Sequence, residues 1–134
     1  MSKNLNIKQV TAAIAIQNGK VLITRRATNE KLAGLWEFPG GKLEANETLF
    51  ECIEREIKEE LGVLCLAKEI FTEAIYEYEF GAIKLIAIFI EFESTEFKLT
   101  VHDQAEWCFI SELGQYELAP ADIPIAKELI KCHQ

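Results

Sequence analysis

The sequence has no long apolar segment. Its longest candidate, Ile83–Ile90, is interrupted by Lys84 and is much shorter than the roughly 18 apolar residues that a membrane helix needs. The first residues, Met1–Asn4, also lack the apolar core of a secretion signal. We therefore expect a soluble, cytoplasmic protein with no membrane partner.

Paired cysteines are also missing. Cys52, Cys65, Cys108 and Cys132 lie far apart, form no Cys-x-x-Cys pair and have no histidine at zinc-finger spacing. This argues against a metal site made of thiolates. Cys52 and Cys108 fall inside apolar patterns, so we expect them to be small buried side chains in a reducing compartment.

Positive charge is scarce. The chain has 14 Lys and Arg against 22 Asp and Glu, a formal net charge of −8, which would repel the phosphate backbone of a nucleic acid polymer. A small phosphorylated ligand is compatible with this charge, because a bound divalent cation reverses the field locally. The 134 residues, 49% of them hydrophobic, fit one domain that spans residues 1–134. We expect it to be a monomer or a weak homodimer.

The first part of the chain predicts a β-hairpin followed by a turn. Two β-rich segments, Val10–Gln17 and Val21–Arg25, flank Asn18-Gly19-Lys20. Asn-Gly is the dipeptide most typical of a tight hairpin. After them, Pro39-Gly40-Gly41 interrupts any regular structure.

The segment from Thr48 to Leu61 predicts a helix. Its apolar residues recur at helical spacing, and Gly62 stands where a C-cap would fall. Thr48 and Glu51 have the spacing of a capping box, so the helix begins at Glu47 or Thr48.

The second part of the chain predicts more strands and a final helix. We expect two or three strands within 63–92, with a hairpin around Gly81, and one short strand at Ala105–Ile110. The strand segments are Val63–Phe71, Glu73–Phe80 and Ile83–Phe92. Leu118–Lys131 reads as a second helix. This order, without a regular βαβ repeat, favours an α+β fold with a mixed β-sheet between helices.

Three glutamates of the predicted helix share one face. Glu56, Glu59 and Glu60 stand at i, i+3 and i+4, within a roughly 100° arc of an ideal helix. Such a cluster is usually a solvated helix face, and Arg55 and Lys58 could partly neutralise it. The other interpretation is a site for Mg²⁺ or Mn²⁺, since both ions prefer oxygen ligands.

The sequence around the cluster favours the metal site. From Gly41 to Val63 the chain resembles the Nudix box, G-x5-E-x7-R-E-U-x-E-E-x-G-U with U aliphatic, at every defined position. These positions are Gly41, Glu47, Arg55, Glu56, Ile57, Glu59, Glu60, Gly62 and Val63. The resemblance to MutT-type Nudix hydrolases and the related CTP pyrophosphohydrolases extends over roughly residues 8–131. It implies the α/β/α Nudix fold.

The resemblance also implies a reaction. In this family, water attacks a phosphorus of a nucleoside triphosphate, and attack at the β-phosphorus gives the monophosphate and pyrophosphate. Glu56, Glu59 and Glu60 are the expected ligands of Mg²⁺, for which Mn²⁺ would substitute, and Glu56 is the first choice of general base.

Further residues are expected to support that site. The backbone carbonyl of Gly40 would join the metal ligands, because the glycines let the chain turn tightly there. Arg55 would pair with Glu47 and hold the ligands in place. Glu106, just before Trp107, matches a further metal-associated glutamate of MutT-like proteins, although an exposed edge-strand residue is the alternative.

Four residues are candidates for substrate binding. Arg26 would contact phosphate, with Arg25 as the other candidate. Phe38 would stack on a base or lie in the core. Asp122 would bind the base edge, or cap the last helix.

The preferred base stays open. MutT has Asn at the position of Asp122, whereas Leu118–Pro124 looks closer to the CTP-type branch. We therefore expect pool-sanitising hydrolysis of 8-oxo-dGTP or of cytosine nucleotides. The alternatives are hydrolysis of nucleotide sugars, dinucleoside polyphosphates or capped RNA, and a non-catalytic nucleotide sensor.

Overall fold

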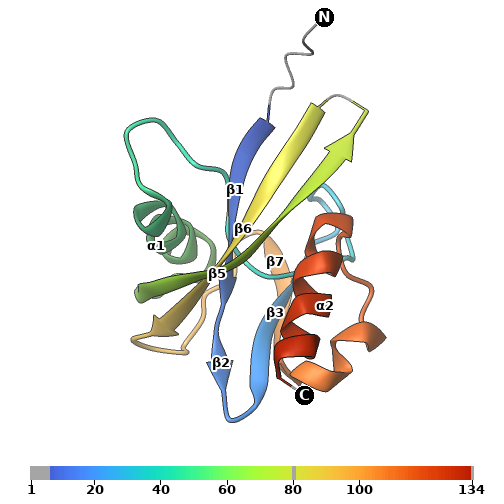
Figure 1. The fold of residues 1–134 in the computed structure, drawn as a ribbon. Helices are drawn as coiled ribbons and strands as arrows, with labels where there is room; N and C mark the ends of the chain where they lie inside the picture. Colours follow the sequence, from blue (N-terminus) through green and yellow to red (C-terminus); the bar gives the residue numbers. More distant parts are fainter. Residues whose placement is uncertain (1–6, 80, 134) are drawn as a thin grey trace, which may run out of the picture.

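The computed structural model describes residues 7–79 and 81–133, which form strands, two α-helices and two short 3₁₀ helices (Figure 1). The elements in chain order are β1 (Ile7–Ile14), β2 (Ile16–Gln17), β3 (Lys20–Arg26), β4 (Trp36–Glu37), α1 (Leu49–Leu61), β5 (Cys65–Tyr78), β6 (Gly81–Phe92), β7 (His102–Phe109), η1 (Ile110–Gln115), η2 (Pro120–Asp122) and α2 (Ile123–Cys132).

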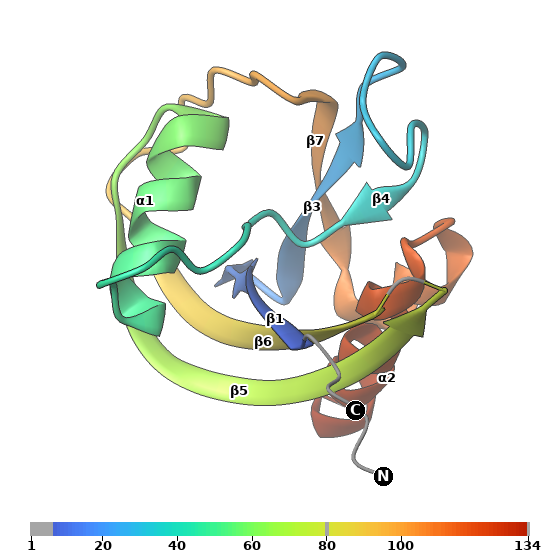
Figure 2. The same cartoon turned by 90° about the horizontal axis from the view of Figure 1, so that it is seen from above.

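The strands form two sheets. In the first, β6 lies between β1, to which it is parallel, and β5, to which it is antiparallel. In the second, β3 is antiparallel to β2, β4 and β7. In Figure 2, β5 and β6 curve together beneath β1, with α1 near one end of the curve. The prediction of a mixed sheet with helices in an α+β fold is confirmed.

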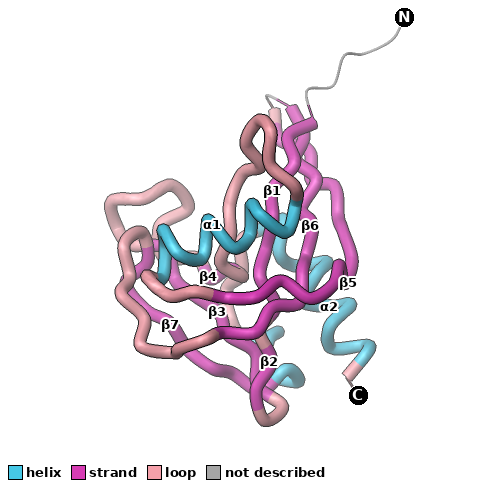
Figure 3. The backbone as a smooth tube through the Cα atoms, turned by 90° about the vertical axis from the view of Figure 1, so that its left-hand side faces the viewer, coloured by secondary structure: helices cyan, strands magenta, loops and turns pink. Residues whose placement is uncertain are grey.

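Side chains that alternate along the central strands enter two different cores. One core, the α2-side core, contains Ala12 and Leu85 together with Ile125 and Leu129 of α2. The other, the α1-side core, contains their strand neighbours, such as Ala13 and Ile86, with Ile53, Ile57 and Leu61 of α1. The alternation follows from the period of two in a strand. Helices α1 and α2 therefore cover opposite faces of the sheet that contains β1 and β6 (Figure 3).

The predicted N-terminal hairpin is present, but only part of its first strand belongs to it. Ile16 pairs with Val21 and Gln17 with Lys20 across the Asn-Gly turn. The preceding residues, Ile7–Ile14, run parallel to β6 in the other sheet. The first strand is thus shared between two sheets, a division that the apolar pattern does not reveal.

Helix α1 begins and ends where the sequence predicts. The Thr48 side chain accepts a hydrogen bond from the Glu51 amide at 3.1 Å, and the Glu51 carboxylate accepts one from the Thr48 amide at 2.8 Å. Gly62 ends the helix in the left-handed region, at φ 69°, which glycine adopts without steric cost. Glu56, Glu59 and Glu60 therefore stand on a helix with both ends fixed.

Of the two or three strands expected within 63–92, two are present. Residues 65–78 form one of them, in which two register shifts accommodate the curvature, and the predicted end at Phe80 lies outside the described residues. Other predicted boundaries were wrong. Strand β7 begins at His102 and not at Ala105. Ile110 begins the 3₁₀ helix η1 instead of ending a strand. Helix α2 begins at Ile123 and not at Leu118, because Leu118 forms a β-bridge with Trp36 of β4.

None of the helices in the described ranges is both long and apolar enough to cross a bilayer.

Candidate functional site

The glycine turn before α1 is packed between β1 and the helix. The amide of Thr11 donates to Gly41 O and that of Ala13 to Pro39 O, both at 2.7 Å. A Cβ on Gly40 would overlap the carbonyl oxygen of Thr11, and one on Gly41 would overlap the carboxylate of Glu56. Both positions therefore need glycine, and the backbone of the turn lies directly against a box glutamate.

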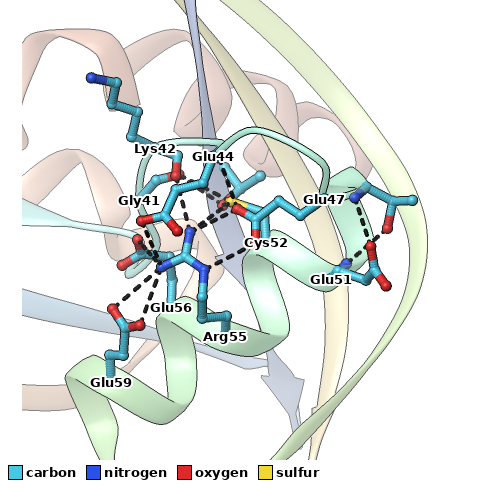
Figure 4. Close-up of polar contacts among 11 residues, drawn as sticks. Gly41, Lys42, Glu44, Glu47, Glu51, Cys52, Arg55, Glu56 and Glu59 are labelled. Carbon is cyan, nitrogen blue, oxygen red and sulfur yellow. Dashed lines mark hydrogen bonds and ion pairs between the residues drawn. The ribbon is translucent and has the colours of Figure 1, made fainter.

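Arg55 joins this turn to the helix (Figure 4). Its Nε and Nη2 donate to the two carboxylate oxygens of Glu47 at 3.0 and 2.7 Å. Nη1 donates to Glu56 at 3.0 Å and to Glu59 at 3.3 Å, and Nη2 also reaches the carbonyl of Lys42 at 3.1 Å. The expected pair of Arg55 and Glu47 is thus present, within a larger network that also fixes Glu56.

The charges in this network shift one another's titration. Hydrogen bonds from Arg55 lower the pKa of Glu47 to about 2. The hydrogen bond with Glu47 is the main cause of a raised pKa for Arg55, and the contacts with Glu56 and Glu59 add to it. Burial raises the pKa of Glu56, although Arg55 opposes the shift. Glu47 is therefore a fixed anion that orients Arg55, whereas Glu56 is closer to accepting a proton.

Glu60 is the most deeply buried carboxylate of the box, with 9% of its surface exposed. The amide of Gly40 donates to its Oε1 at 3.3 Å. Burial raises the pKa of Glu60 to about 8, and repulsion from Glu37 and Glu56 adds to the shift. Crowded carboxylates with only oxygen donors fit a divalent cation, which would remove both penalties.

Two residues that the sequence motifs did not indicate lie beside Glu60. The ligand atoms of Glu37, Glu60 and His102 all lie within 4.8 Å of one another. His102 Nε2 is 2.7 Å from Glu37 Oε2. Glu37 lies just before Pro39-Gly40-Gly41 and His102 lies near Glu106, but neither belongs to a motif of its own.

The structure does not bring Glu106 together with the box glutamates. Glu106 is opposite Ile23, which belongs to the α2-side core, whereas its strand neighbours Ala105 and Trp107 pack against the α1-side core. The Glu106 carboxylate accepts a hydrogen bond from Tyr116 Oη at 3.1 Å. Since opposed residues share a face, Glu106 points away from α1.

The two candidate arginines have different surroundings. Arg26 contacts Glu37 and Glu30, each at 3.3 Å, and its side chain is 19% exposed. Arg25 makes two hydrogen bonds to Asp103, at 2.8 and 3.1 Å, on the surface. Arg26 is therefore the arginine that lies next to Glu37, which is itself close to Glu60.

A pocket lies on the other side of Glu37. It has a volume of about 120 Å³, and its lining includes Glu37, Phe38, Gly40, Tyr78 and Asp122. Phe38 is only 3% exposed, so it belongs to the α2-side core and also borders the pocket. Glu37 and Gly40 thus connect the pocket with Glu60.

Asp122 occupies the N-cap position of α2, but its buried carboxylate does not cap the helix. Its side chain makes no capping hydrogen bond at the start of α2, so that alternative was wrong. Instead, Asp122 Oδ1 accepts a hydrogen bond from the Phe38 amide at 3.0 Å. Burial raises its pKa well above the usual range, and Glu37 adds to the shift. A neutral carboxyl group there can donate as well as accept a hydrogen bond.

Known proteins similar to this chain match it over most of its length. The NUDIX domain family matches residues 7–129. A CTP pyrophosphohydrolase of Escherichia coli (strain K12) is 38% identical over 118 residues, which cover 87% of each chain. An 8-oxo-dGTP diphosphatase of the same organism is 30% identical over 126 residues, 92% of this chain and 98% of the relative.

Solved structures agree on the fold. The solution structure of the E. coli ORF135 protein has a TM-score of 0.85 and 35% identity, and the match covers 95% of this chain and 91% of that one. A MutT protein from Methanosarcina mazei Go1, with a TM-score of 0.87 and 23% identity, covers 99% of both chains and supports the fold alone. Because the family match spans most of the residues and includes the whole network around Arg55, the chain belongs to the Nudix hydrolase family.

Proposed function

We propose that this Nudix hydrolase cleaves nucleoside triphosphates to the monophosphate and pyrophosphate, with Mg²⁺ as its cofactor and Mn²⁺ as a substitute. The observation that carries the proposal is the position of the pocket. Gly40 lines the pocket and its amide also binds Glu60, so a nucleoside in the pocket would have its phosphates beside the box carboxylates.

The pocket is small, and its size suits one nucleobase with the sugar and phosphates outside it. Its volume of about 120 Å³ is well below the roughly 300–1,000 Å³ of sites for larger ligands. A second nucleoside or a sugar would have to lie outside it. The choice of triphosphates over dinucleoside polyphosphates and nucleotide sugars rests on the relatives, which are named for CTP and 8-oxo-dGTP.

In this proposal the box residues have separate roles. Glu56, Glu59 and Glu60, with the carbonyl of Gly40, would hold the cation, and a bound divalent cation would supply charge to neutralise phosphate oxygens and would lower the pKa of the attacking water. Glu56 accepts the proton of that water, and its raised pKa and its contact with Arg55 suit a positioned base.

The pocket residues would bind the nucleoside. Asp122 contacts the base edge, and Phe38 borders the base. Arg26 would turn from Glu37 and Glu30 toward a phosphate. The relatives act on CTP or 8-oxo-dGTP by name. We propose both base classes as substrates for testing, with the chain working as a monomer or weak homodimer.

Hydrolysis of a nucleotide panel in ¹⁸O-water tests the function. The panel contains 8-oxo-dGTP, dGTP, CTP, dCTP, 5-methyl-dCTP, ADP-ribose and a diadenosine polyphosphate, each with Mg²⁺ and with EDTA. We expect metal-dependent release of pyrophosphate, with ¹⁸O in the pyrophosphate because water attacks the β-phosphorus. Label in the monophosphate would place the attack at the α-phosphorus. Turnover of ADP-ribose or the diadenosine compound alone would overturn the proposed substrate class.

Two variants connect the activity to the site. Glu60→Gln removes a proposed metal ligand, and Glu69→Gln removes an exposed carboxylate on β5. We expect activity to be lost in the first and kept in the second. Equal activity in both would contradict the metal role of Glu60.

A further inference from the structure

A β-bulge directs His102 toward the site. On β7, Gln104 is opposite Arg25, but His102, and not Asp103, is opposite Arg26. In a regular ladder Asp103 would take that place and add a carboxylate near Glu37 and Glu60. The extra residue puts an imidazole there instead, while Asp103 pairs with Arg25 on the surface.

The only side-chain hydrogen bond of His102 within the described residues goes to Glu37. The histidine side chain is 0% exposed and its Nε2 is 2.7 Å from Glu37 Oε2. Its Nδ1 is buried and has no hydrogen-bond partner in that part of the chain. Burying an imidazole with one unsatisfied nitrogen costs stability, so the position is not explained by packing alone.

Glu37 in turn forms part of the pocket wall. His102 and Arg26 both bind its Oε2, at 2.7 and 3.3 Å. Neither donor uses Oε1, and Glu37 lines the pocket together with Asp122. The amide of the next residue, Phe38, binds Asp122. The direction of the Glu37 carboxylate therefore decides which hydrogen-bond acceptors the pocket offers.

We propose that His102 is a positioning residue for nucleoside binding. Through its Nε2–H it fixes Glu37 Oε2, so that Oε1 accepts a hydrogen bond from an N–H or O–H group of the bound nucleoside. This rests on the proposed function, because it takes the pocket as the nucleoside site. His102 itself touches no substrate.

Binding of nucleoside monophosphates separates this role from metal binding. The dissociation constants of CMP and 8-oxo-dGMP are measured calorimetrically in EDTA for the wild type, His102→Leu and His102→Gln. Leu removes the donor, whereas the Gln amide has a nitrogen at a similar distance along the side chain. The comparison uses whichever of the two monophosphates the wild type binds more tightly. We expect His102→Leu to bind it about tenfold more weakly, and His102→Gln to bind it about as tightly as the wild type does. In turnover, KM should rise in His102→Leu without a comparable fall in kcat.

A double-mutant cycle tests whether His102 acts through Glu37. Once Glu37→Gln is in place, adding His102→Leu should weaken binding little further. A full additional loss would show that His102 acts independently and would overturn the proposal. So would unchanged monophosphate binding in His102→Leu, or a loss confined to Mn²⁺ affinity, which would make the histidine a metal ligand.

Cys108→Ala is the matched control for disturbance of the strand. Cys108 is buried on β7 opposite Val21, away from Glu37. This variant should lose stability and keep monophosphate affinity. If His102→Leu does not fold, the cycle is run with His102→Asn, whose shorter side chain places its amide nitrogen too far back to replace Nε2; monophosphate affinity equal to that of the wild type in both His102→Asn and Glu37→Gln would overturn the proposal. If monophosphate binding responds as expected but no triphosphate is hydrolysed, the proposed reaction fails and the positioning role stands.

Discussion

The guanidinium of Arg55 binds both carboxylate oxygens of Glu47, at 3.0 and 2.7 Å, from a position two turns further along the chain. Glu47 precedes α1 and Arg55 lies within it, so this pair ties the loop before the helix to the helix face that carries Glu56 and Glu59. A planar, two-point contact of this kind restricts the angle as well as the distance between its partners.

Loss of the Arg55 contacts should weaken the site more than loss of charge alone. We expect Arg55→Gln to lower Mn²⁺ affinity and kcat/KM by roughly 10–100-fold, because residues that orient metal ligands have effects of this size. Lys58→Gln removes the same charge from an exposed position on the same helix and is the control. Calorimetric titration with Mn²⁺ compares the two. Equal losses would mean that helix charge matters and not the geometry of Arg55.

A methyl group on Gly41 should displace Glu56. Since the Cβ would overlap the Glu56 carboxylate, we expect Gly41→Ala to cut kcat about 100-fold and to cost about 1–3 kcal/mol of unfolding free energy. Gly114→Ala is the control, because nothing lies within 4 Å of a Cβ there. Steady-state kinetics and urea unfolding measure both effects. Full activity in Gly41→Ala would show that Glu56 can move without loss.

The metal-free protein should lose stability as the pH rises because of Glu60. Its pKa is raised from 4.5 to about 8 in the folded protein, so the carboxyl group holds its proton more tightly there than in the unfolded chain. The stability associated with protonated Glu60 is fully present below pH 4.5 and is lost as the pH rises through about 8. Burial of the charged form is the main cause of this loss.

Glu60→Gln tests this assignment. In EDTA, the difference in Tm between Glu60→Gln and the wild type should grow in favour of the variant between pH 5 and pH 8. Adding Mg²⁺ at pH 8 should stabilise the wild type more than the variant. A constant difference across the pH range would contradict the raised pKa.

Replacement of Asp122 should change base preference and preserve the fold. In Asp122→Asn the side-chain oxygen can still accept from the Phe38 amide, so Tm should stay near that of the wild type. The buried carboxyl group is gone, however, and we expect the ratio of kcat/KM for CTP and 8-oxo-dGTP to change by about tenfold or more. Parallel loss on both substrates would mean that Asp122 supports the pocket without reading the base.

Local patterns predicted the parts of the structure that depend on local interactions. The caps of α1 were predictable because Thr48, Glu51 and Gly62 act within one or two turns of the helix. The Arg55 pair was inferred from the family motif, and it too joins residues close in the chain. Both are short-range contacts, for which spacing in the sequence is a good guide to spacing in space.

The contact between Glu37 and His102 could not be predicted in this way. It joins β4 to β7 and exists because both strands pair with β3 and because β7 carries a bulge. The start of α2 was misplaced for a related reason. Ala119 donates its amide to Trp36 O at 2.8 Å, so this segment is held beside β4 although its composition suits a helix.

The residues proposed for phosphate chemistry and some of those proposed for base binding lie in different segments of the chain. The proposed phosphate chemistry depends on α1 and the turn before it, whereas Asp122 lies in the connection that leads to α2 and Tyr78 at the end of β5. The proposed roles therefore predict that substitutions in those two segments change which nucleobase is accepted while the box glutamates stay as they are. On this proposal, a library for altered base selectivity can begin with the residues around Tyr78 and Asp122, which lie apart in sequence from the catalytic turn and α1, whereas Glu37 and Phe38 adjoin that turn.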